Sequence, residues 1–163
     1  MTEDGFASFF REQFSRIALT LIADGASLAD AEDATQEAMV LARRKWDSIG
    51  NHAAWVHTVA RRRYRRVLRM RKPTVQLPES ALETAAASDA SDLSIFTEEQ
   101  QHVLGVIRQL PLMQGQVFAR VYYGLSCKEI AEVLGVSEAT VRSHLRHARN
   151  NLKEILKEMM LSA

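Results

Sequence analysis

Apolar side chains recur at intervals of three and four residues along most of this chain, and this spacing marks one face of an α-helix. The first such run consists of large side chains four, three and four residues apart, namely Phe10, Phe14, Ile17 and Leu21. The run predicts a helix from about Gly5 to Asp24. Gly25 would end it, because glycine tolerates the left-handed backbone conformation that often follows a helix.

A second helix is predicted from Leu28 to about Trp46. Ser27 is placed to cap its first turn, with Asp30 three residues later. The stripe expected to face inward is made mostly of small residues: Ala31, Ala34, Ala38 and Leu41. Small side chains allow helices to approach closely, so we expect this helix to pack tightly against its neighbours.

The helical pattern breaks between Asp47 and His52, where Gly50 and Asn51 indicate a loop. A third helix is predicted from about Ala53. Its inward stripe is Val56, Ala60, Tyr64 and Val67.

Four more helices are predicted in the second half of the chain. Thr97 and Gln100 form a capping box at the start of the first one, and Pro111 interrupts it. Its inward side chains are Val103, Leu104 and Ile107. The next helix runs from about Gly115 to Tyr123 and is ended by Gly124. Its expected buried residues are Val117, Phe118, Val121 and Tyr122.

The last two predicted helices form a pair joined by a tight turn. Ser126, with Glu129 three residues later, starts a short helix that ends at Leu134. Gly135 supplies the turn and Ser137 caps the final helix. The inward residues of that helix lie four, three and four apart: Val141, Leu145, Ala148 and Leu152. The helix can continue through Ile155 and Met159.

The outward stripe of the final helix is charged and mostly basic: Glu138, Arg142, Arg146 and Arg149. Two short helices, a glycine-containing turn and a cationic second helix are the layout of a helix-turn-helix, whose second helix enters the major groove of DNA. Arginine suits this face because its planar fork binds guanine edges or phosphates. The alternative is a helical hairpin that binds nothing.

These elements predict an all-α protein of two small helical domains, residues 1–72 and 97–163, joined by a flexible acidic linker at residues 73–96. The net charge of +1 hides an asymmetry. Residues 1–72 hold 13 Lys/Arg against 9 Asp/Glu, residues 73–102 hold none against 6, and residues 103–163 hold 8 against 5, which gives +4, −6 and +3. Two basic modules around an acidic connector favour nucleic acid as a partner.

The third helix ends in a run of arginines, with eight basic residues among the twelve of 61–72. Such a run is favourable at a helix C-terminus and can be a solvated end, but repulsion among the cations favours binding to a polyanion. Trp55, just upstream, is placed either to stack on an unpaired base or to complete the core.

Polar residues and one valine share another face of the second helix: Asp30, Asp33, Gln36, Glu37 and Val40. This face is either a solvated acidic surface, whose acids are favourable near the helix N-terminus, or a docking surface for a basic partner.

Other classes of function receive little support. Cys127 is the only cysteine, which excludes an internal disulfide, and with His144 and His147 it makes too small a set for a metal site. We expect no metal, no cofactor and no catalytic activity, because neither a phosphate-binding loop nor a nucleophile with its base can be placed. The chain has no apolar run long enough to span a membrane and no secretion signal, which predicts a soluble, cytoplasmic protein.

Both halves together resemble the extracytoplasmic-function sigma factors, the compact two-domain branch of the bacterial sigma superfamily. Three segments carry the resemblance: DAEDATQEAM at 30–39, AWVHTVARRR at 54–63 and LPLMQGQVFARVYYGLSCKEIAEVLGVSEATVRSHLRHAR at 110–149. They are similar to the family's D-A-E-D-x-x-Q-E and W-L-x-x-I-A-R-N motifs and to its helix-turn-helix, in the family's order.

The resemblance implies that residues 1–72 are sigma region 2 and residues 97–163 are sigma region 4. It implies promoter recognition, DNA melting and transcription initiation without bond chemistry by the chain. The implied contacts with core RNA polymerase, on the clamp helices of its largest subunit, are Asp30, Asp33, Gln36, Glu37 and Val40. The flap region of the polymerase and an anti-sigma factor are further implied partners.

The resemblance also implies two sets of DNA contacts. Those for the minus-ten element are Gly50, Asn51, His52, Trp55, Arg61, Arg62 and Arg65. Those for the minus-thirty-five element are Ser137, Glu138, Ala139, Thr140, Arg142, Ser143 and Arg146. The chain departs from the family pattern at Arg62, where an asparagine is usual, near Arg65, where an aspartate is usual, and at Ala139, where a glycine is usual. The first two departures make the third helix more basic.

Two other interpretations fit parts of the sequence. A helix-turn-helix regulator of another class would share the segment from Ser126 to Arg149, but the helical, arginine-ended first third argues against it. An inactive sigma mimic that only sequesters a partner would share the whole pattern, although basic surfaces in both halves weigh against that.

Overall fold

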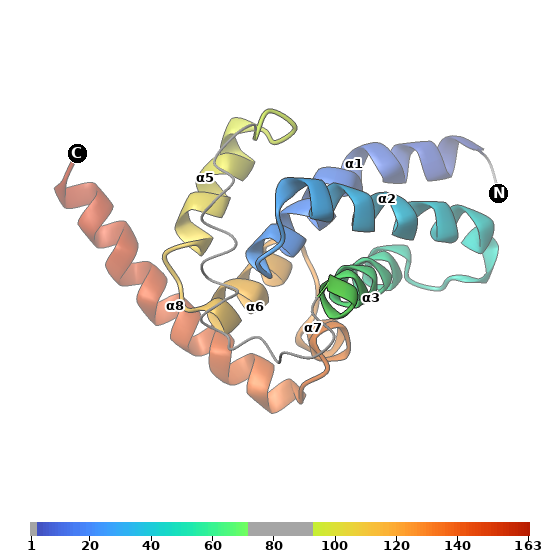
Figure 1. The fold of residues 1–163 in the computed structure, drawn as a ribbon. Coiled ribbons are helices and arrows are strands. Elements are labelled where there is room, and N and C mark those ends of the chain that lie inside the picture. The colour runs from blue at the N-terminus through green and yellow to red at the C-terminus, as the bar shows by residue number, and fades with distance from the viewer. Residues whose placement is uncertain (1–2, 72–92) are drawn as a thin grey trace. The chain divides into compact units, whose positions relative to one another are not determined.

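The computed structural model describes residues 3–71 and 93–163, and every regular element in these ranges is a helix (Figure 1). The chain divides into two compact units, Met1–Ile95 and Phe96–Ala163. Most of the predicted linker, residues 73–92, lies outside the described residues. No described helix combines the length and the apolar character that crossing a membrane requires.

Unit 1 is built from three α-helices: α1 (Glu3–Ala23), α2 (Leu28–Arg44) and α3 (His52–Arg71), with a short 3-10 helix, η1 (Trp46–Ser48), before α3. The predicted boundaries between α1 and α2 are confirmed. Gly25 has a φ of 107°, and the Ser27 hydroxyl accepts a hydrogen bond from the backbone N–H of Asp30 at 3.2 Å. Helix α2 packs against both α1 and α3, as its small inward residues led us to expect.

The core of unit 1 contains most of the side chains that the sequence pattern predicts. Fully or almost fully buried members from the three helices are Ile17, Leu21, Ala31, Ala34, Ala38, Val56, Ala60 and Tyr64. Four of the predicted side chains are less buried than expected: Phe10 and Val67 are each 37% exposed, and Phe14 and Leu41 are only half-buried. Ala42 and Met39 take the inner positions beside Leu41, and α3 runs past the core after Tyr64.

Unit 2 consists of α5 (Glu98–Ile107), α6 (Leu112–Tyr122), α7 (Cys127–Leu134) and α8 (Glu138–Leu161). The capping box of Thr97 and Gln100 is present. Helix α6 begins directly after Pro111, earlier than predicted, because proline is well tolerated just ahead of a first helical turn. Gly124 ends it with a φ of 91°.

Two apolar clusters form the core of unit 2. The first joins α6, α7 and the start of α8, and its buried members are Val117, Leu125, Ile130, Ala131, Val133, Leu134, Val141 and Leu145. The second is made by Leu110, Ala148 and Leu152. Tyr122 was wrongly predicted as buried: it is 41% exposed, and its hydroxyl donates to Glu99. Val103, Phe118 and Val121 are half-buried.

Candidate functional site

The helix-turn-helix of unit 2 is built by local capping. The Ser126 hydroxyl accepts from the Glu129 N–H at 3.1 Å at the start of α7, and Gly135 ends α7 in the left-handed conformation with a φ of 69°. The Ser137 hydroxyl then accepts from the Thr140 N–H at 3.1 Å and starts α8. Val141 and Leu145 are buried against α7, so the opposite face of α8 is left in solvent.

The residues predicted to read DNA occupy the first three turns of α8, but they are not equivalent. The exposed ones are Glu138, Ala139, Arg142 and Arg146, and Ser143 is half-buried. Ser137 is committed to the cap, because its Oγ lies 2.8 Å from Thr140 Oγ1 in addition to accepting from the Thr140 N–H. Ser137 and Thr140 therefore position the helix, and the readable surface comes from the remaining residues.

The two arginines of this surface differ in their surroundings. Arg142 Nη1 donates to Glu138 Oε2 at 3.2 Å, and both side chains are largely exposed. Arg146, one turn further along, is exposed and forms no ion pair with any described residue. Glu138 thus orients the Arg142 side chain before a ligand binds, whereas no ion pair with a described residue orients the Arg146 side chain.

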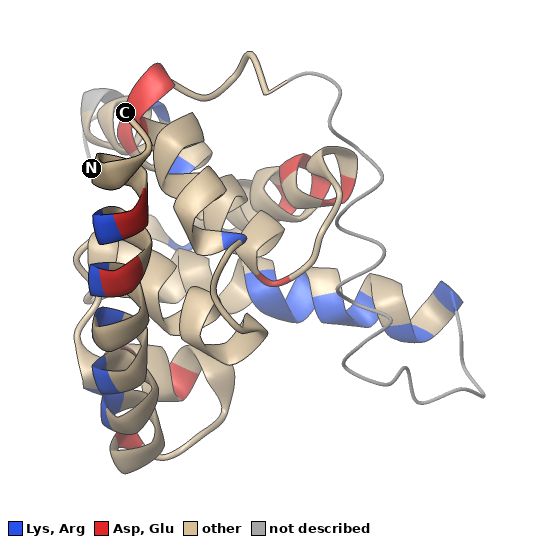
Figure 2. Cartoon of the chain, turned by 90° about the vertical axis from the view of Figure 1, so that its left-hand side faces the viewer, with Lys and Arg blue, Asp and Glu red and all other residues tan. Residues whose placement is uncertain are grey.

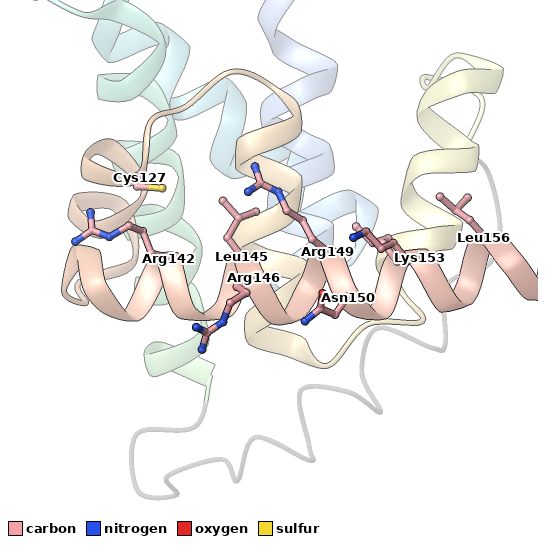
Figure 3. Close-up of a pocket in the computed structure, with 9 residues that line it drawn as sticks. Cys127, Arg142, Leu145, Arg146, Arg149, Asn150, Lys153 and Leu156 are labelled. Atoms are coloured by element: carbon pink, nitrogen blue, oxygen red, sulfur yellow. The ribbon is translucent and has the colours of Figure 1, made fainter.

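A groove of about 790 Å³ lies along α8 beside the start of α7. The side chains that line it are Cys127, Arg142, Leu145, Arg146, Arg149, Asn150, Leu152, Lys153 and Leu156. In Figure 3, Leu145 and Leu156 point to one side of the helix together with Arg149, and Arg146 points to the other. Arg149 is exposed, as predicted, but it lies on the side of Leu145 and not on that of Arg146. Asn150 and Lys153 were missed, although their spacing from Arg142 and Arg146 would have placed them on this face.

In unit 1 the arginines of α3 fall into two groups. Three of them pair with acids of α2 or of the turn before it, and these pairs are Arg61 with Asp24 at 3.5 Å, Arg63 with Glu37 at 3.8 Å and Arg71 with Asp30 at 2.7 Å. The other four are exposed and share one helix face, because Arg65 and Arg66 lie three and four residues after Arg62, and Arg69 follows them at four and three: Arg62, Arg65, Arg66 and Arg69. We call these four the arginine stripe. Figure 2 shows Lys and Arg along α3 up to the end of the described part.

This grouping changes the predicted minus-ten set. Arg61 has a side chain that is only 14% exposed and is paired with the buried Asp24, so it belongs to the scaffold of unit 1. Arg66 and Arg69 belong to the exposed stripe and were missed, because the sequence alone does not show which arginines the acids engage. Trp55 lies seven residues before Arg62 and so on the same face, and it is half-buried.

The loop between α2 and α3 is closed at its base by an aromatic contact. The His52 ring stacks on Trp46 with centroids 3.6 Å apart and planes 7° apart, and His52 Nε2 lies 2.9 Å from the Trp46 carbonyl oxygen. Phe6 and Phe9 of α1 meet the Trp46 ring edge-on at 5.4 and 5.2 Å. Gly50 and Asn51 remain exposed at the tip. The sequence prediction missed Trp46.

Asn51, predicted as a DNA contact, also has a structural role in this loop. Its Oδ1 accepts from the backbone N–H of Ala54 at 3.1 Å and so caps the first turn of α3. Helix α3 consequently begins at His52, one residue earlier than predicted.

The acidic face of α2 is exposed at four of its five predicted residues, Asp33, Gln36, Glu37 and Val40, and the valine is 47% exposed. Asp30 differs: its side chain is 16% exposed, and its two carboxylate oxygens accept from Arg71 Nη1 and Nη2 at 2.7 and 2.8 Å. These hydrogen bonds, with the charge of Asp30, raise the pKa of Arg71 above its ordinary value. Burial, with the charges of Asp24 and Asp30, raises the pKa of Tyr64 to about 12.

No group of three or more His, Cys, Asp or Glu residues in the described ranges could hold a metal ion. His147 is exposed and His144 is half-buried on α8.

Comparison with known families assigns each unit. Residues 10–74 match the family model for sigma-70 region 2, and residues 101–152 match the model for sigma-70 region 4. These two matches, together with the helical fold and its helix-turn-helix, define a sigma factor, which is a class of DNA-binding transcription regulators.

Similar proteins show to which branch of the sigma factors the chain belongs. The chain is 32% identical over 152 residues to the ECF RNA polymerase sigma factor SigL of Mycobacterium tuberculosis, covering 88% of this chain and 82% of SigL. It is 30% identical over 161 residues to the ECF RNA polymerase sigma factor SigF of Caulobacter vibrioides, covering 93% and 87%. The chain belongs to the extracytoplasmic-function sigma factors, and it is an alternative sigma factor that directs transcription initiation.

Solved structures share the fold. One is the sigma factor RpoE of Bartonella quintana in complex with the anti-sigma factor NepR, with a TM-score of 0.58 and 23% identity over 92% of this chain and 97% of that one. Another is CnrH in complex with the cytosolic domain of CnrY, with a TM-score of 0.57 and 20% identity over 96% and 90%.

Proposed function

We propose that this chain binds core RNA polymerase through α2 and brings two DNA-reading surfaces to a promoter in the cytoplasm. The observation that carries this proposal is the sorting of charge in unit 1. One helix keeps exposed acids, and the next keeps an exposed arginine stripe on the same face as a tryptophan. Separate surfaces of opposite charge allow one small domain to hold a protein and a nucleic acid together.

The polymerase contact is assigned to Asp33, Gln36, Glu37 and Val40. Two carboxylates, an amide and an exposed valine suit a basic helical surface such as the clamp helices of the largest subunit, because charges at the rim steer association and the apolar side chain is buried on docking. Unit 2 would contact the flap region.

The minus-ten contact is assigned to the loop tip, Trp55 and the arginine stripe. Gly50, Asn51 and Trp55 offer hydrogen bonds and a ring face to a base that has left the stack, and Arg62 with its stripe neighbours follows the phosphates. His52 shapes the loop through Trp46. Strand separation is driven by this binding energy, which the closed duplex cannot obtain.

The minus-thirty-five contact is assigned to the first turns of α8. Arg142 and Arg146 are long enough to reach base edges or phosphates in the major groove, and Ala139 with Ser143 lets the helix approach closely. Glu138 orients Arg142 and can accept from a cytosine amino group.

An anti-sigma factor is proposed as a further partner. In one similar solved structure RpoE is bound to the anti-sigma factor NepR, and in another CnrH is bound to the cytosolic domain of CnrY. The groove along α8 combines leucines with four cations, which suits an acidic amphipathic helix. Because Arg142 and Arg146 line this groove, an occupant would block DNA reading.

Run-off transcription tests the proposal. Purified core polymerase lacking sigma is incubated with the chain and with fragmented genomic DNA, and the 5′ ends of the transcripts are sequenced. We expect the ends to cluster at defined sites that share two upstream elements. A helix-turn-helix regulator of another class would not confer initiation on core enzyme. A sequestering mimic would co-purify with core polymerase and yield no clustered ends.

A further inference from the structure

The last two turns of α3 extend beyond the core of unit 1. Tyr64 is the last buried residue of this helix, and from 65 to 71 every side chain is exposed except the half-buried Leu68. This segment, which we call the α3 extension, carries Arg65, Arg66 and Arg69 of the arginine stripe. It therefore holds three of the four stripe arginines without the apolar packing that fixes the rest of the helix.

Such an extension is unstable by itself. Arg69 lies four and three residues after Arg65 and Arg66, and like charges at these spacings repel along a helix surface. Helix ends also fray when no side chain or tertiary contact fixes them. The favourable placement of cations near a helix C-terminus offsets only part of this cost.

Among the described residues, one ion pair ties the extension to the rest of unit 1. Arg71, the last residue of α3, donates two hydrogen bonds to the carboxylate of Asp30 in the first turn of α2, across 41 positions of sequence. Residues 65–70 form no ion pair with another described residue. A two-bond arginine–carboxylate pair fixes orientation as well as distance, which a single ion pair does not.

We propose that Asp30 is a positioning residue for DNA rather than a contact for polymerase: by holding Arg71 it keeps the α3 extension helical and directs the arginine stripe toward the promoter. This assignment rests on the proposed function of the stripe, and it moves Asp30 out of the docking face. Asp33, one turn along α2, is exposed and forms no ion pair with a described residue, so it keeps the role of a polymerase contact.

The first test needs no polymerase and uses the free full-length chain. Amide hydrogen exchange is measured for peptides covering residues 65–71 in Asp30→Asn, Arg71→Glu and the reciprocal double variant Asp30→Lys with Arg71→Glu. We expect amide exchange to be about fivefold faster in each single variant. This factor corresponds to losing the largest stabilisation that an exposed ion pair usually provides. The double variant should recover at least half of this protection.

Glu32→Gln is the matched control, since Glu32 lies on the same helix, is half-buried and forms no ion pair with a described residue. It should leave exchange of 65–71 unchanged. Unchanged exchange in Asp30→Asn would overturn the proposal whether or not the chain acts at promoters, so this arm separates it from the proposed function.

The second test compares polymerase association with promoter opening for the same variants. Asp30→Asn should bind core polymerase within about twofold of the original chain and open the promoter at least fivefold more slowly, followed with 2-aminopurine in the minus-ten element. The double variant should recover the rate of promoter opening, because it restores opposite charges at positions 30 and 71. Such recovery is expected only if the two residues act as a pair. Loss of core association in Asp30→Asn that Arg71→Glu does not share would instead make Asp30 a polymerase contact and refute the proposal.

Discussion

The Glu37 carboxylate lies 3.8 Å from the Arg63 guanidinium, so the acidic face of α2 and the basic helix α3 meet at an exposed pair. The distance is long, and the side chains of Glu37 and Arg63 are 60% and 35% exposed. A pair of this kind contributes little to stability, about 0–1 kcal/mol. Glu37 can therefore exchange its internal partner for a cation of another protein at low cost.

Reversal of this charge should weaken docking without unfolding unit 1. We expect Glu37→Lys to lower the affinity for core polymerase by about tenfold, because it places a cation against a basic surface. The measurement is co-sedimentation or fluorescence anisotropy with core enzyme, with circular dichroism to monitor the fold. Equal affinity of the two forms would return the acidic face to solvent.

Removal of an arginine from α8 should weaken binding to a duplex that contains the minus-thirty-five element. We expect Arg146→Ala to cost about 1–3 kcal/mol if the side chain reads a base, and to change base preference at one position. A phosphate contact would instead weaken binding to all sequences alike and reduce the salt dependence. If neither Arg146→Ala nor Arg142→Ala alters affinity, α8 does not read the groove.

Loss of the ring contact beneath the loop should slow promoter opening. His52→Ala removes both the stack on Trp46 and the hydrogen bond to its carbonyl, and an aromatic pair contributes about 0.5–1.5 kcal/mol beyond burial. We expect slower opening of a fluorescent minus-ten element, with duplex binding by α8 unchanged. His52→Phe keeps the ring and should open faster than His52→Ala; equal rates in these variants would show that stacking is not what shapes the loop.

The pKa of Tyr64 predicts a loss of stability in strong base. Below its ordinary value of 10.0 the phenol is neutral in both folded and unfolded chains, so its contribution is fully present. Between pH 10 and about 12 the unfolded chain releases this proton while the folded chain retains it, so stability falls as pH rises. The expected loss is on the order of 2 kcal/mol in urea unfolding. Tyr64→Phe should reduce this loss, and an identical pH dependence in the variant would contradict the assignment.

The cap of α8 should be worth a measurable part of the stability of unit 2. Ser137→Ala leaves the Thr140 N–H without its partner and should cost ~1 kcal/mol in thermal or urea unfolding. Ser143→Ala is the control, because alanine inside a helix is slightly favourable. A Ser137→Ala chain as stable as the control would show that solvent replaces the cap without loss.

Helix boundaries were predictable because their causes are local. Ser27, Thr97 and Ser137 cap their helices with hydrogen bonds to residues three positions away, and Gly25 and Gly135 adopt the positive φ values that end the preceding helices. Such contacts involve neighbours in the chain, so residue type and spacing determine them.

The sorting of the arginines was not predictable, because it depends on contacts between distant residues. Arg61 and Arg62 are adjacent and identical, yet only Arg61 reaches the buried Asp24. Likewise, the spacing of Asp30 and Asp33 on α2 does not show that Asp30 will pair with Arg71, which lies 41 residues further along the chain. The same limit explains why Trp46 was missed as the base of the loop.

The stacked rings beneath the loop have an optical consequence. The chain holds two tryptophans, Trp46 and Trp55, and both lie in the unit assigned to the minus-ten element. A histidine ring in van der Waals contact with an indole changes its emission, so the intensity from Trp46 reports any separation of the two rings. The protein thus carries an unlabelled fluorescent reporter at the place where strand opening is proposed to begin.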